Sequence, residues 1–289
     1  MSVKNLVGLI GWPLHHSISY AMHNAAFKHL NIDWLYINFL VAKVPYIRIK
    51  EAILGLRALS IKGANITSPY KELVIPYLDK LSQDANSIGA VNTIDIKSDG
   101  SLVGYNTDHE GFIRDLYEHD IDPAVQDVLL IGAGGAARAI SYGLLKNGCK
   151  QLVILNRTKN KADELAYKLN DEFKQAYVSS DYFSNETIRK YCSASLIVNT
   201  TDVGMKNNEI PWDVCTCFTK DQIVYDTIYN PYESALLSFA KKCNAKNING
   251  LGMLIHQAAL AFEVWTKQEA PLEIMKKAAY KQLGIPYVP

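Results

Sequence analysis

The feature that most constrains the fold is the stretch VLLIGAGGAARAI, residues 128–140. It begins as a continuous apolar run, which is typical of a buried parallel strand, turns at Gly132, Gly134 and Gly135, and continues as an alanine-rich helix. The first N–H groups of a helix have no partners within it, and the helix dipole favours negative charge there. Gly132 permits the tight turn, Gly134 lets a pyrophosphate approach the backbone, and Ala137 lets helix and strand pack closely. The stretch predicts a dinucleotide site, with an ordinary strand-to-helix turn as the alternative.

The turn after the next predicted strand reads NRTKNK, residues 156–161. An NAD-binding protein usually has Asp or Glu there to accept a hydrogen bond from the ribose 2′-hydroxyl, whereas Arg suits a 2′-phosphate. No acidic residue follows the strand before Asp163, and Arg157 and Lys161 supply positive charge. The turn therefore favours NADP over NAD, and the alternative is a solvated basic turn.

Composition excludes several classes of partner. The chain has 289 residues, enough for one or two domains, with 48% hydrophobic and 20% charged residues, as in ordinary globular proteins. Its 30 Lys and Arg against 29 Asp and Glu argue against a nucleic-acid or membrane-surface partner. No apolar run is long enough to span a bilayer, and the N-terminus reads as a first strand, not a secretion signal. We expect a small-molecule substrate and a cytoplasmic monomer or homodimer.

Cysteine and histidine spacing predicts neither disulfides nor a metal site. The five cysteines form no CxxC pattern, and they are Cys149, Cys192, Cys215, Cys217 and Cys243. We interpret all five as reduced thiols of a cytosolic protein. The seven histidines show no metal-ligand spacing, so we expect no metal.

Alternation of apolar strands and amphipathic helices predicts an α/β protein of two domains. Strands are expected at residues 5–11, 34–41, 64–67, 91–96, 102–105, 128–131, 151–155, 196–199 and 223–226. Helices are expected at residues 20–30, 44–59, from Pro69 onward, and at 108–119, 160–173, 252–265 and 272–283. Residues 1–107, completed by 251–289, would form an α/β substrate domain with a mixed sheet. Residues 108–250 would form a Rossmann-type, doubly wound NADP domain. The C-terminal helices would pack back on the first domain, with a substrate cleft between the two domains.

Two segments of the first domain carry candidate ligand groups. In HHSIS, residues 15–19, Ser17 or Ser19 can cap the following helix, and the same hydroxyls can bind a carboxylate at its N-terminus. In GANITSPYK, residues 63–71, Lys71 lies just past a strand, where the ligand cleft of an α/β sheet opens. Partial desolvation would lower the pKa of this lysine and let it shuttle a proton, and the alternative is an ordinary solvated lysine.

Amide side chains form the remaining candidates. GAVNT and GYNTD, residues 89–93 and 104–108, place Asn-Thr pairs at strand ends, where they can contact a polyhydroxylated ligand, and Asp108 could hold Lys71. The alternative is turn chemistry, which favours Asn, Thr and Asp. Gln257 is a single amide in an otherwise apolar helix. It is either a core group with its hydrogen bonds satisfied, or it lies in the cleft wall and reaches a hydroxyl of the ligand.

Together the motifs resemble those of the shikimate dehydrogenase family, in order and over nearly the whole chain. They are HSIS, NITSPYK, GAVNT, GYNTD, GAGGAARA, NRT, NTTDVGM, YDTIYNP and GLGMLIHQA followed by FEVWT. Each is weak alone, but the ordered set is highly specific. The resemblance implies reduction of 3-dehydroshikimate to shikimate with NADPH, in aromatic amino-acid biosynthesis.

The resemblance also implies roles for individual residues. Lys71 and Asp108 would be the catalytic pair. Ser17 and Ser19 would bind the substrate carboxylate, and the rest of the pocket would be lined by Thr67, Asn92, Tyr229 and Gln257. The pyrophosphate would lie against Gly132, Ala133, Gly134, Gly135 and Ala136. The 2′-phosphate would be held by Asn156, Arg157, Thr158 and Lys161, and the nicotinamide end by Thr227, Ile228 and Gly250.

The chain departs from the family pattern beside the predicted catalytic pair. His109 stands where glycine is usual, and could alter substrate scope or pH profile; Ser68 replaces an aliphatic residue. Tyr20, Ser234 and Lys267 are further departures. Three other functions stay open: a quinate/shikimate dehydrogenase, which often uses NAD, a non-catalytic ligand sensor of the same fold, and a folate-linked dehydrogenase. The last would not need the paired serines, and retention of Lys71 and Asp108 argues against the sensor.

Overall fold

A computed structural model of the chain describes residues 5–42, 47–206, 209–210, 212 and 218–287. Cys215, Cys217 and the first three residues of the helix predicted at 44–59 lie outside these residues. The chain divides into two compact units, Met1–Gly111 with Ile255–Pro289, and Phe112–Leu254. The final two helices therefore belong almost entirely to the first unit.

The first unit contains a six-stranded mixed sheet in the order β2-β1-β3-β5-β6-β4. Its strands are β1 (Asn5–Gly11), β2 (Trp34–Leu40), β3 (Gly63–Ile66), β4 (Lys80–Leu81), β5 (Thr93–Ile96) and β6 (Leu102–Tyr105). β1 runs parallel to both β2 and β3, and β5 runs antiparallel to β3 and β6. The mixed sheet and the hairpin expected from the sequence are confirmed.

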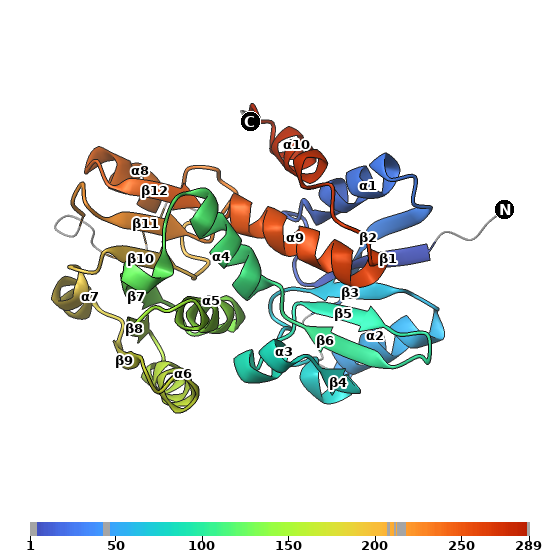
Figure 1. Ribbon diagram of the computed structural model, residues 1–289, viewed down its shortest axis with the longest axis horizontal. Coiled ribbons are helices and arrows are strands. Elements are labelled where there is room, and N and C mark those ends of the chain that lie inside the picture. The colour runs from blue at the N-terminus through green and yellow to red at the C-terminus, as the bar shows by residue number, and fades with distance from the viewer. Residues whose placement is uncertain (1–4, 43–46, 207–208, 211, 213–217, 288–289) are drawn as a thin grey trace. The chain divides into compact units, whose positions relative to one another are not determined.

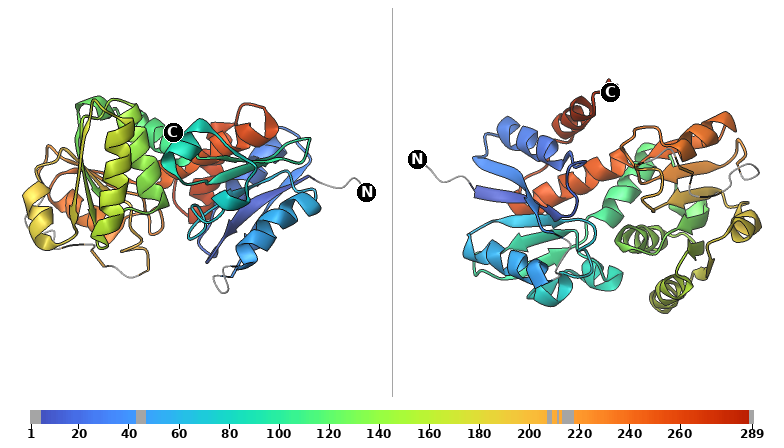
Figure 2. Two further views of the ribbon diagram at one scale, coloured as in Figure 1. Left: turned by 90° about the horizontal axis from the view of Figure 1, so that it is seen from below. Right: turned by 180° about the vertical axis from the view of Figure 1, so that it is seen from behind.

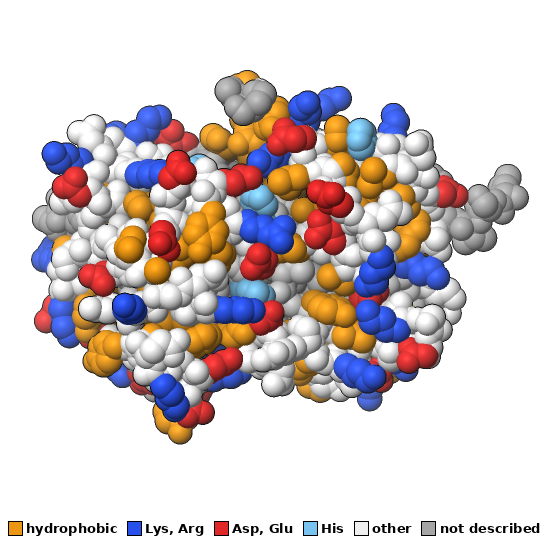
Figure 3. All heavy atoms as spheres, in the orientation of Figure 1, with side chains coloured by type: hydrophobic (Ala, Val, Ile, Leu, Met, Phe, Trp, Pro, Cys, Tyr) orange, Lys and Arg blue, Asp and Glu red, His pale blue; other side chains and the backbone are white. Residues whose placement is uncertain are grey.

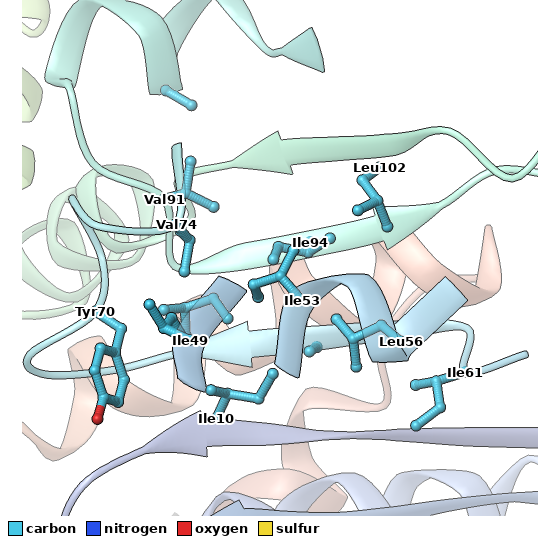
Figure 4. Close-up of a cluster of buried hydrophobic side chains, with 13 residues drawn as sticks. Ile10, Ile49, Ile53, Leu56, Ile61, Tyr70, Val74, Val91, Ile94 and Leu102 are labelled. Atoms are coloured by element: carbon cyan, nitrogen blue, oxygen red, sulfur yellow. The ribbon is translucent and has the colours of Figure 1, made fainter. Parts of the chain in front are cut away.

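Helices cover both faces of this sheet (Figures 1 and 2). They are α1 (Ser19–His29), α2 (Ile47–Ala58), α9 (Leu251–Thr266) and α10 (Leu272–Leu283), with the short α3 (Gln83–Ile88) at one end. On one face, α2 presents Ile49, Ile53 and Leu56 to strand residues such as Ile94 and Leu102 (Figure 4). Their spacing puts them on one side of the helix, and each buried side chain contributes about 1.5–3 kcal/mol. α10 packs against α1.

The opposite face of the sheet packs against aromatic side chains. The Phe27 ring of α1 lies 5.3 Å from the Phe262 ring of α9, and both side chains are buried. Trp265, near the end of α9, donates a hydrogen bond from its indole Nε1 to the Ile94 carbonyl at 3.0 Å. This bond satisfies a buried donor and joins α9 to β5.

The second unit is a doubly wound parallel sheet in the order β12-β11-β10-β7-β8-β9, as predicted. Its strands are β7 (Asp127–Ile131), β8 (Gln151–Asn156), β9 (Tyr177–Tyr182), β10 (Leu196–Asn199), β11 (Ile223–Asp226) and β12 (Lys246–Asn249). Its helices are α4 (Asp108–Glu118), α5 (Gly135–Lys146), α6 (Lys159–Glu172), α7 (Asn185–Tyr191) and α8 (Ala235–Lys242). α5 and α6 lie on one side of the sheet and α7 lies on the other (Figure 1). The direction of winding reverses between β7 and β10, which is where such sheets bind ligands.

Some local structure differs from the sequence-based expectation. The helical stretch expected from Pro69 is wrong, because turns follow and only the 3₁₀ helix η1 (Ile75–Tyr77) forms. Pro76 explains part of this, since proline lacks the N–H that an α-helix interior needs. The elements β4, α3, β9, α7, α8 and β12 were not anticipated. In β9 and α7 only Val178 and Ile188 are buried, so their apolar pattern is too weak to be recognised.

The face of the molecule drawn in Figure 3 carries charges of both signs. Lys and Arg side chains are interspersed with Asp and Glu over the face in Figure 3.

Within the described residues, no helix has the length and apolar character needed to cross a bilayer. The same residues contain no group of three or more His, Cys, Asp or Glu side chains arranged to hold a metal ion.

Candidate active site

The predicted substrate residues of the first unit gather at one edge of its sheet. β1 and β3 are parallel, so the segments that follow them leave from the same edge. β5 is antiparallel and begins at this edge, and β6 returns the chain to it. The residues placed there by these four strands are Ser17, Ser19, Thr67, Lys71, Asn92 and Asp108.

Lys71 and Asp108 form a shielded ion pair. Lys71 Nζ donates to Asp108 Oδ2 at 2.6 Å, and the two side chains are 18% and 7% exposed. The Lys71 carbonyl accepts a hydrogen bond from the Val91 N–H at 2.8 Å, which fixes the loop carrying the lysine. Asp108 begins α4, where the helix dipole favours its negative charge. The pair can present a charged ammonium whose direction the carboxylate sets.

Asn92 and Gln257 complete this cluster. Asn92 Nδ2 donates to Asp108 Oδ1 at 2.8 Å and lies 3.4 Å from Gln257 Oε1. Asn92 Oδ1 accepts from the Thr107 N–H at 2.8 Å, and its side chain is buried. Both carboxylate oxygens of Asp108 are thus engaged. Turn chemistry, the alternative considered above, applies to Asn106, whose Oδ1 accepts from the Asp108 N–H at 3.0 Å.

The paired serines do not cap α1 in the way that their position suggested. The N-cap residue is Ile18, which makes no side-chain cap bond, and Ser17 Oγ instead accepts from the Ser19 N–H at 3.3 Å. An accepting hydroxyl keeps its own proton to donate. Thr67 is half-buried beside Gly11, where an added Cβ would lie 2.3 Å from Thr67 Cγ2. Glycine at the end of β1 therefore makes room for the threonine.

His109 forms a contact of its own beside the Lys71–Asp108 ion pair. It is buried, and its Nε2 lies 3.5 Å from Asp84 Oδ2 on α3. This contact joins α3 to the first turn of α4, next to Asp108.

The glycine turn of the second unit has the shape of an anion cradle. Gly132 has φ +116°, and an added Cβ would lie 2.2 Å from Thr200 Oγ1, so only glycine fits. Gly134 is the N-cap of α5, without a side-chain cap bond, and a Cβ there would meet nothing within 4 Å. Gly135 and Ala136 form the first turn beyond it. Open space therefore lies at this helix N-terminus, which fits a pyrophosphate.

The turn after β8 presents basic and polar groups. Asn156 Nδ2 donates to the Thr158 carbonyl at 2.8 Å, which orders the turn. Its exposed side chains include Arg157, Thr158 and Lys161. The first acid, Asp163, accepts from Lys159 Nζ and from Ser180 Oγ, each at 2.7 Å. These bonds hold the pKa of Asp163 below its usual range. Asp163 is thus engaged within its own helix and with β9, which leaves the turn suited to a phosphate.

Thr227, Ile228 and Gly250 meet at the carboxyl ends of β11 and β12. The Gly250 N–H donates to the Ile228 carbonyl at 3.1 Å. A Cβ at Gly250 would lie 2.1 Å from the Thr227 carbonyl oxygen, so the two backbones can approach only because residue 250 is glycine. The structure therefore brings these three residues together at the same sheet edge as the glycine turn.

Sequence reasoning missed the buried pair that supports this edge. Asp226 Oδ1 accepts from Asn199 Nδ2 at 3.0 Å and from the Ile228 N–H at 3.2 Å, and its Oδ2 accepts from Ser234 Oγ at 2.6 Å. Burial raises the pKa of Asp226 to about 6. The available signal was the placement of Asn199 and Asp226 directly at the ends of two neighbouring apolar strands.

Tyr229 follows in the same loop of the second unit. Burial raises the pKa of its phenol to about 12, so the hydroxyl stays protonated at neutral pH. Its contact with substrate stays a prediction.

We expect Asp226→Asn to change how stability depends on pH. Because the pKa of Asp226 is about 6 in the folded chain against 3.8 ordinarily, its stabilising contribution is fully present below pH 3.8. That contribution is lost as the pH rises through 6. Between pH 7 and pH 4 the free energy of unfolding of the wild type should therefore gain about 2 kcal/mol relative to the variant. Urea unfolding of both proteins at several pH values tests this, and parallel curves would contradict it.

Comparison with known proteins identifies relatives over nearly the whole chain. Family profiles described as "Shikimate dehydrogenase substrate binding domain", "Shikimate / quinate 5-dehydrogenase" and "Shikimate 5'-dehydrogenase C-terminal domain" match residues 9–94, 116–186 and 250–280. A shikimate dehydrogenase (NADP(+)) of Methanopyrus kandleri is 43% identical over 282 residues, 96% of each chain.

Two solved structures extend the comparison. A shikimate dehydrogenase crystallised in complex with NADP+ is 38% identical, with a TM-score of 0.85 over 97% of this chain and 96% of that one. The quinate dehydrogenase of Corynebacterium glutamicum, solved with NAD, is 32% identical, with a TM-score of 0.87 over 96% and 99% of the two chains. The similarity thus covers both units.

Proposed function

Because this chain belongs to the shikimate dehydrogenase family, we propose that it reduces 3-dehydroshikimate to shikimate with NADPH, reversibly, in aromatic amino-acid biosynthesis. The observation that carries the proposal is the cluster at the sheet edge of the first unit. There Asp108 holds the Lys71 ammonium with one carboxylate oxygen and the Asn92 amide with the other. This arrangement suits proton donation to a carbonyl oxygen as it becomes an alkoxide.

The chemistry divides between the two units. NADPH, when bound, supplies the hydride that the C3 carbonyl carbon of the substrate receives. Lys71, as ammonium, donates a proton to the carbonyl oxygen and so stabilises the charge that develops there. Asp108 keeps the ammonium oriented, and Asn92 keeps Asp108 in place. In the reverse direction, neutral Lys71 accepts the proton from the C3 hydroxyl.

Binding roles follow from position. The hydroxyls of Ser17 and Ser19, at the start of α1, would hold the substrate carboxylate. Pocket contacts would come from Thr67, Asn92, Tyr229 and Gln257. The open N-terminal turn of α5 would hold the pyrophosphate, at Gly132, Ala133, Gly134, Gly135 and Ala136. The 2′-phosphate would be held by Asn156, Arg157, Thr158 and Lys161, and the nicotinamide end would lie near Thr227, Ile228 and Gly250.

Domain limits, location and assembly are part of the same proposal. The substrate domain comprises residues 1–107 with 251–289, and the cofactor domain comprises 108–250. A cytoplasmic location is consistent with the free thiols of Cys149, Cys192 and Cys243. The proposed assembly is a monomer or a homodimer.

A four-way assay tests the proposed substrate and cofactor. Shikimate and quinate are each offered with NADP+ and with NAD+, and kcat/KM is measured for each pair. We expect the highest value with shikimate and NADP+, because the turn after β8 carries Arg157 and its first acid is engaged elsewhere. Higher values with quinate would support the broader quinate/shikimate activity. Binding of both ligands without turnover would show a sensor and overturn the proposal.

A further inference from the structure

We propose that Asn65 is a positioning residue for the reaction, which holds Asn92 and, through Asn92, holds Asp108. Tyr36 in turn orients Asn65. The inference rests on the proposed function, because it assigns a purpose to a buried network that ends on the catalytic pair. Asn65 lies in β3 and Tyr36 in β2, on either side of β1.

Asn65 bonds to three neighbours at once. Its Oδ1 accepts from the Tyr36 hydroxyl at 2.9 Å. Its Nδ2 donates to the Asn92 carbonyl at 3.2 Å and to Thr93 Oγ1 at 3.0 Å. The side chain is 5% exposed, so a lost bond would leave a buried polar group unsatisfied. One amide therefore joins β3 to the residue that holds Asp108.

The direction of these bonds is determined by the groups at their ends. The Asn92 carbonyl can only accept, so Asn65 must present its NH₂ group there. Thr93 Oγ1 receives the second N–H of Asn65, and its own proton goes to Asn92 Oδ1 at 3.0 Å. Asn92 Oδ1 thus accepts from both the Thr93 hydroxyl and the Thr107 N–H. The NH₂ group of Asn92 therefore faces Asp108. One orientation of the Asn65 amide and one of the Asn92 amide therefore satisfy all of these hydrogen bonds together.

Tyr36 is itself held firmly. Its backbone N–H donates to Asn24 Oδ1 at 2.8 Å and its carbonyl accepts from Asn24 Nδ2 at 3.0 Å, so a side chain of α1 satisfies both groups on this edge strand. The His23 ring stacks on the Tyr36 ring at 4.4 Å and 4°. Burial lowers the pKa of His23 to about 3, so the stacked ring is neutral. A fixed, uncharged support thus aims the Tyr36 hydroxyl at Asn65.

The test compares Asn65→Leu and Tyr36→Phe with a matched control, Tyr70→Phe. Tyr70 is as buried as Tyr36, but its hydroxyl donates to the Val41 carbonyl at 2.8 Å and points away from the hydrophobic cluster (Figure 4). We expect kcat/KM for shikimate to fall about 10- to 100-fold in Asn65→Leu and about three- to tenfold in Tyr36→Phe. Tyr70→Phe should stay within about twofold of wild type. NADPH binding, measured by titration, counts folded molecules in each preparation.

A double-mutant cycle separates positioning from a general loss of structure. If Asn65 acts through Asn92, Asn65→Leu should lower kcat/KM much less in an Asn92→Ala background than in the wild type. A structural defect would lower it equally in both backgrounds. Equal losses, wild-type activity in Asn65→Leu, or equal effects of Tyr36→Phe and Tyr70→Phe would overturn the proposal. If the wild-type protein turned over neither shikimate nor quinate, the proposed function would fail, and this inference with it. An active wild type with unaffected variants would remove the inference alone.

Discussion

Replacement of Lys71 by alanine is expected to lower kcat by several orders of magnitude while substrate affinity changes little. The reason is that Lys71 is the cation Asp108 holds at 2.6 Å, and the proposed mechanism has no other proton donor at the carbonyl oxygen. The groups proposed to bind the substrate carboxylate and hydroxyls remain in the variant. Steady-state kinetics in both directions, with substrate affinity measured by titration, check the separation of kcat from binding. Turnover near the wild-type value would remove Lys71 from the mechanism.

Lys97→Ala is the matched control for this experiment. Lys97 is also a paired lysine of the first unit, with its Nζ 2.5 Å from Asp95 Oδ2. Its removal leaves Asp95 with a second cation, since Lys267 Nζ lies 3.5 Å from the same oxygen. Lys97→Ala should therefore keep kcat close to that of the wild type. A large loss in this control would mean that any broken ion pair in the unit disturbs activity.

Replacement of Arg157 by alanine is expected to raise the KM for NADPH about 10- to 100-fold and to leave the KM for NADH nearly unchanged. A guanidinium can donate two charge-assisted bonds to a 2′-phosphate, and NADH has no such group to lose. The preference for NADPH should collapse accordingly. Kinetics with both cofactors test this, and equal losses with NADPH and NADH would show that Arg157 supports the turn without reading the phosphate.

Lys159→Ala controls for a general loss of positive charge in the same turn. Lys159 Nζ lies 2.7 Å from Asp163 Oδ1, so the carboxylate largely neutralises the charge of this lysine. An exposed i,i+4 pair contributes little to stability. The variant should therefore keep most of the preference for NADPH, and a loss as large as that of Arg157→Ala would point to the overall charge of the turn.

Local patterns predicted the fold well where a segment buries a continuous or periodic apolar face. β1, β7, β10 and β11 are short apolar runs, and α10 shows a clear helical repeat, so each was located to within a residue or two. Elements that bury only one or two side chains, such as β9, carry no such signal. The stretch after Pro69 failed because its local pattern resembles a helix, while the structure forms turns there.

The candidate site was partly visible for the same reason. Lys71, Asn92 and Asp108 were singled out because polar groups directly after or before a strand lie at a sheet edge. Asn65, by contrast, lies inside β3 and reads as an ordinary strand residue. Asn199 and Asp226 lie at the ends of two apolar strands, but only the pairing of β10 with β11 brings Asp226 Oδ1 within 3.0 Å of Asn199 Nδ2.

The sequence by itself determined the elements that bury a continuous or periodic apolar face, the glycine turn at Gly132 and the positive turn at Arg157, because these depend on neighbours a few residues apart. Only the tertiary structure decided which polar groups meet. The Tyr36–Asn65 bond joins residues 29 apart, and the Asn92–Gln257 contact joins residues 165 apart. Periodicity says which face of a strand is buried, but strand order and register decide what that face touches. The glycine turn marks where a cofactor would bind, while the arrangement of Lys71, Asp108 and Asn92 comes from the pairing of β3, β5 and β6.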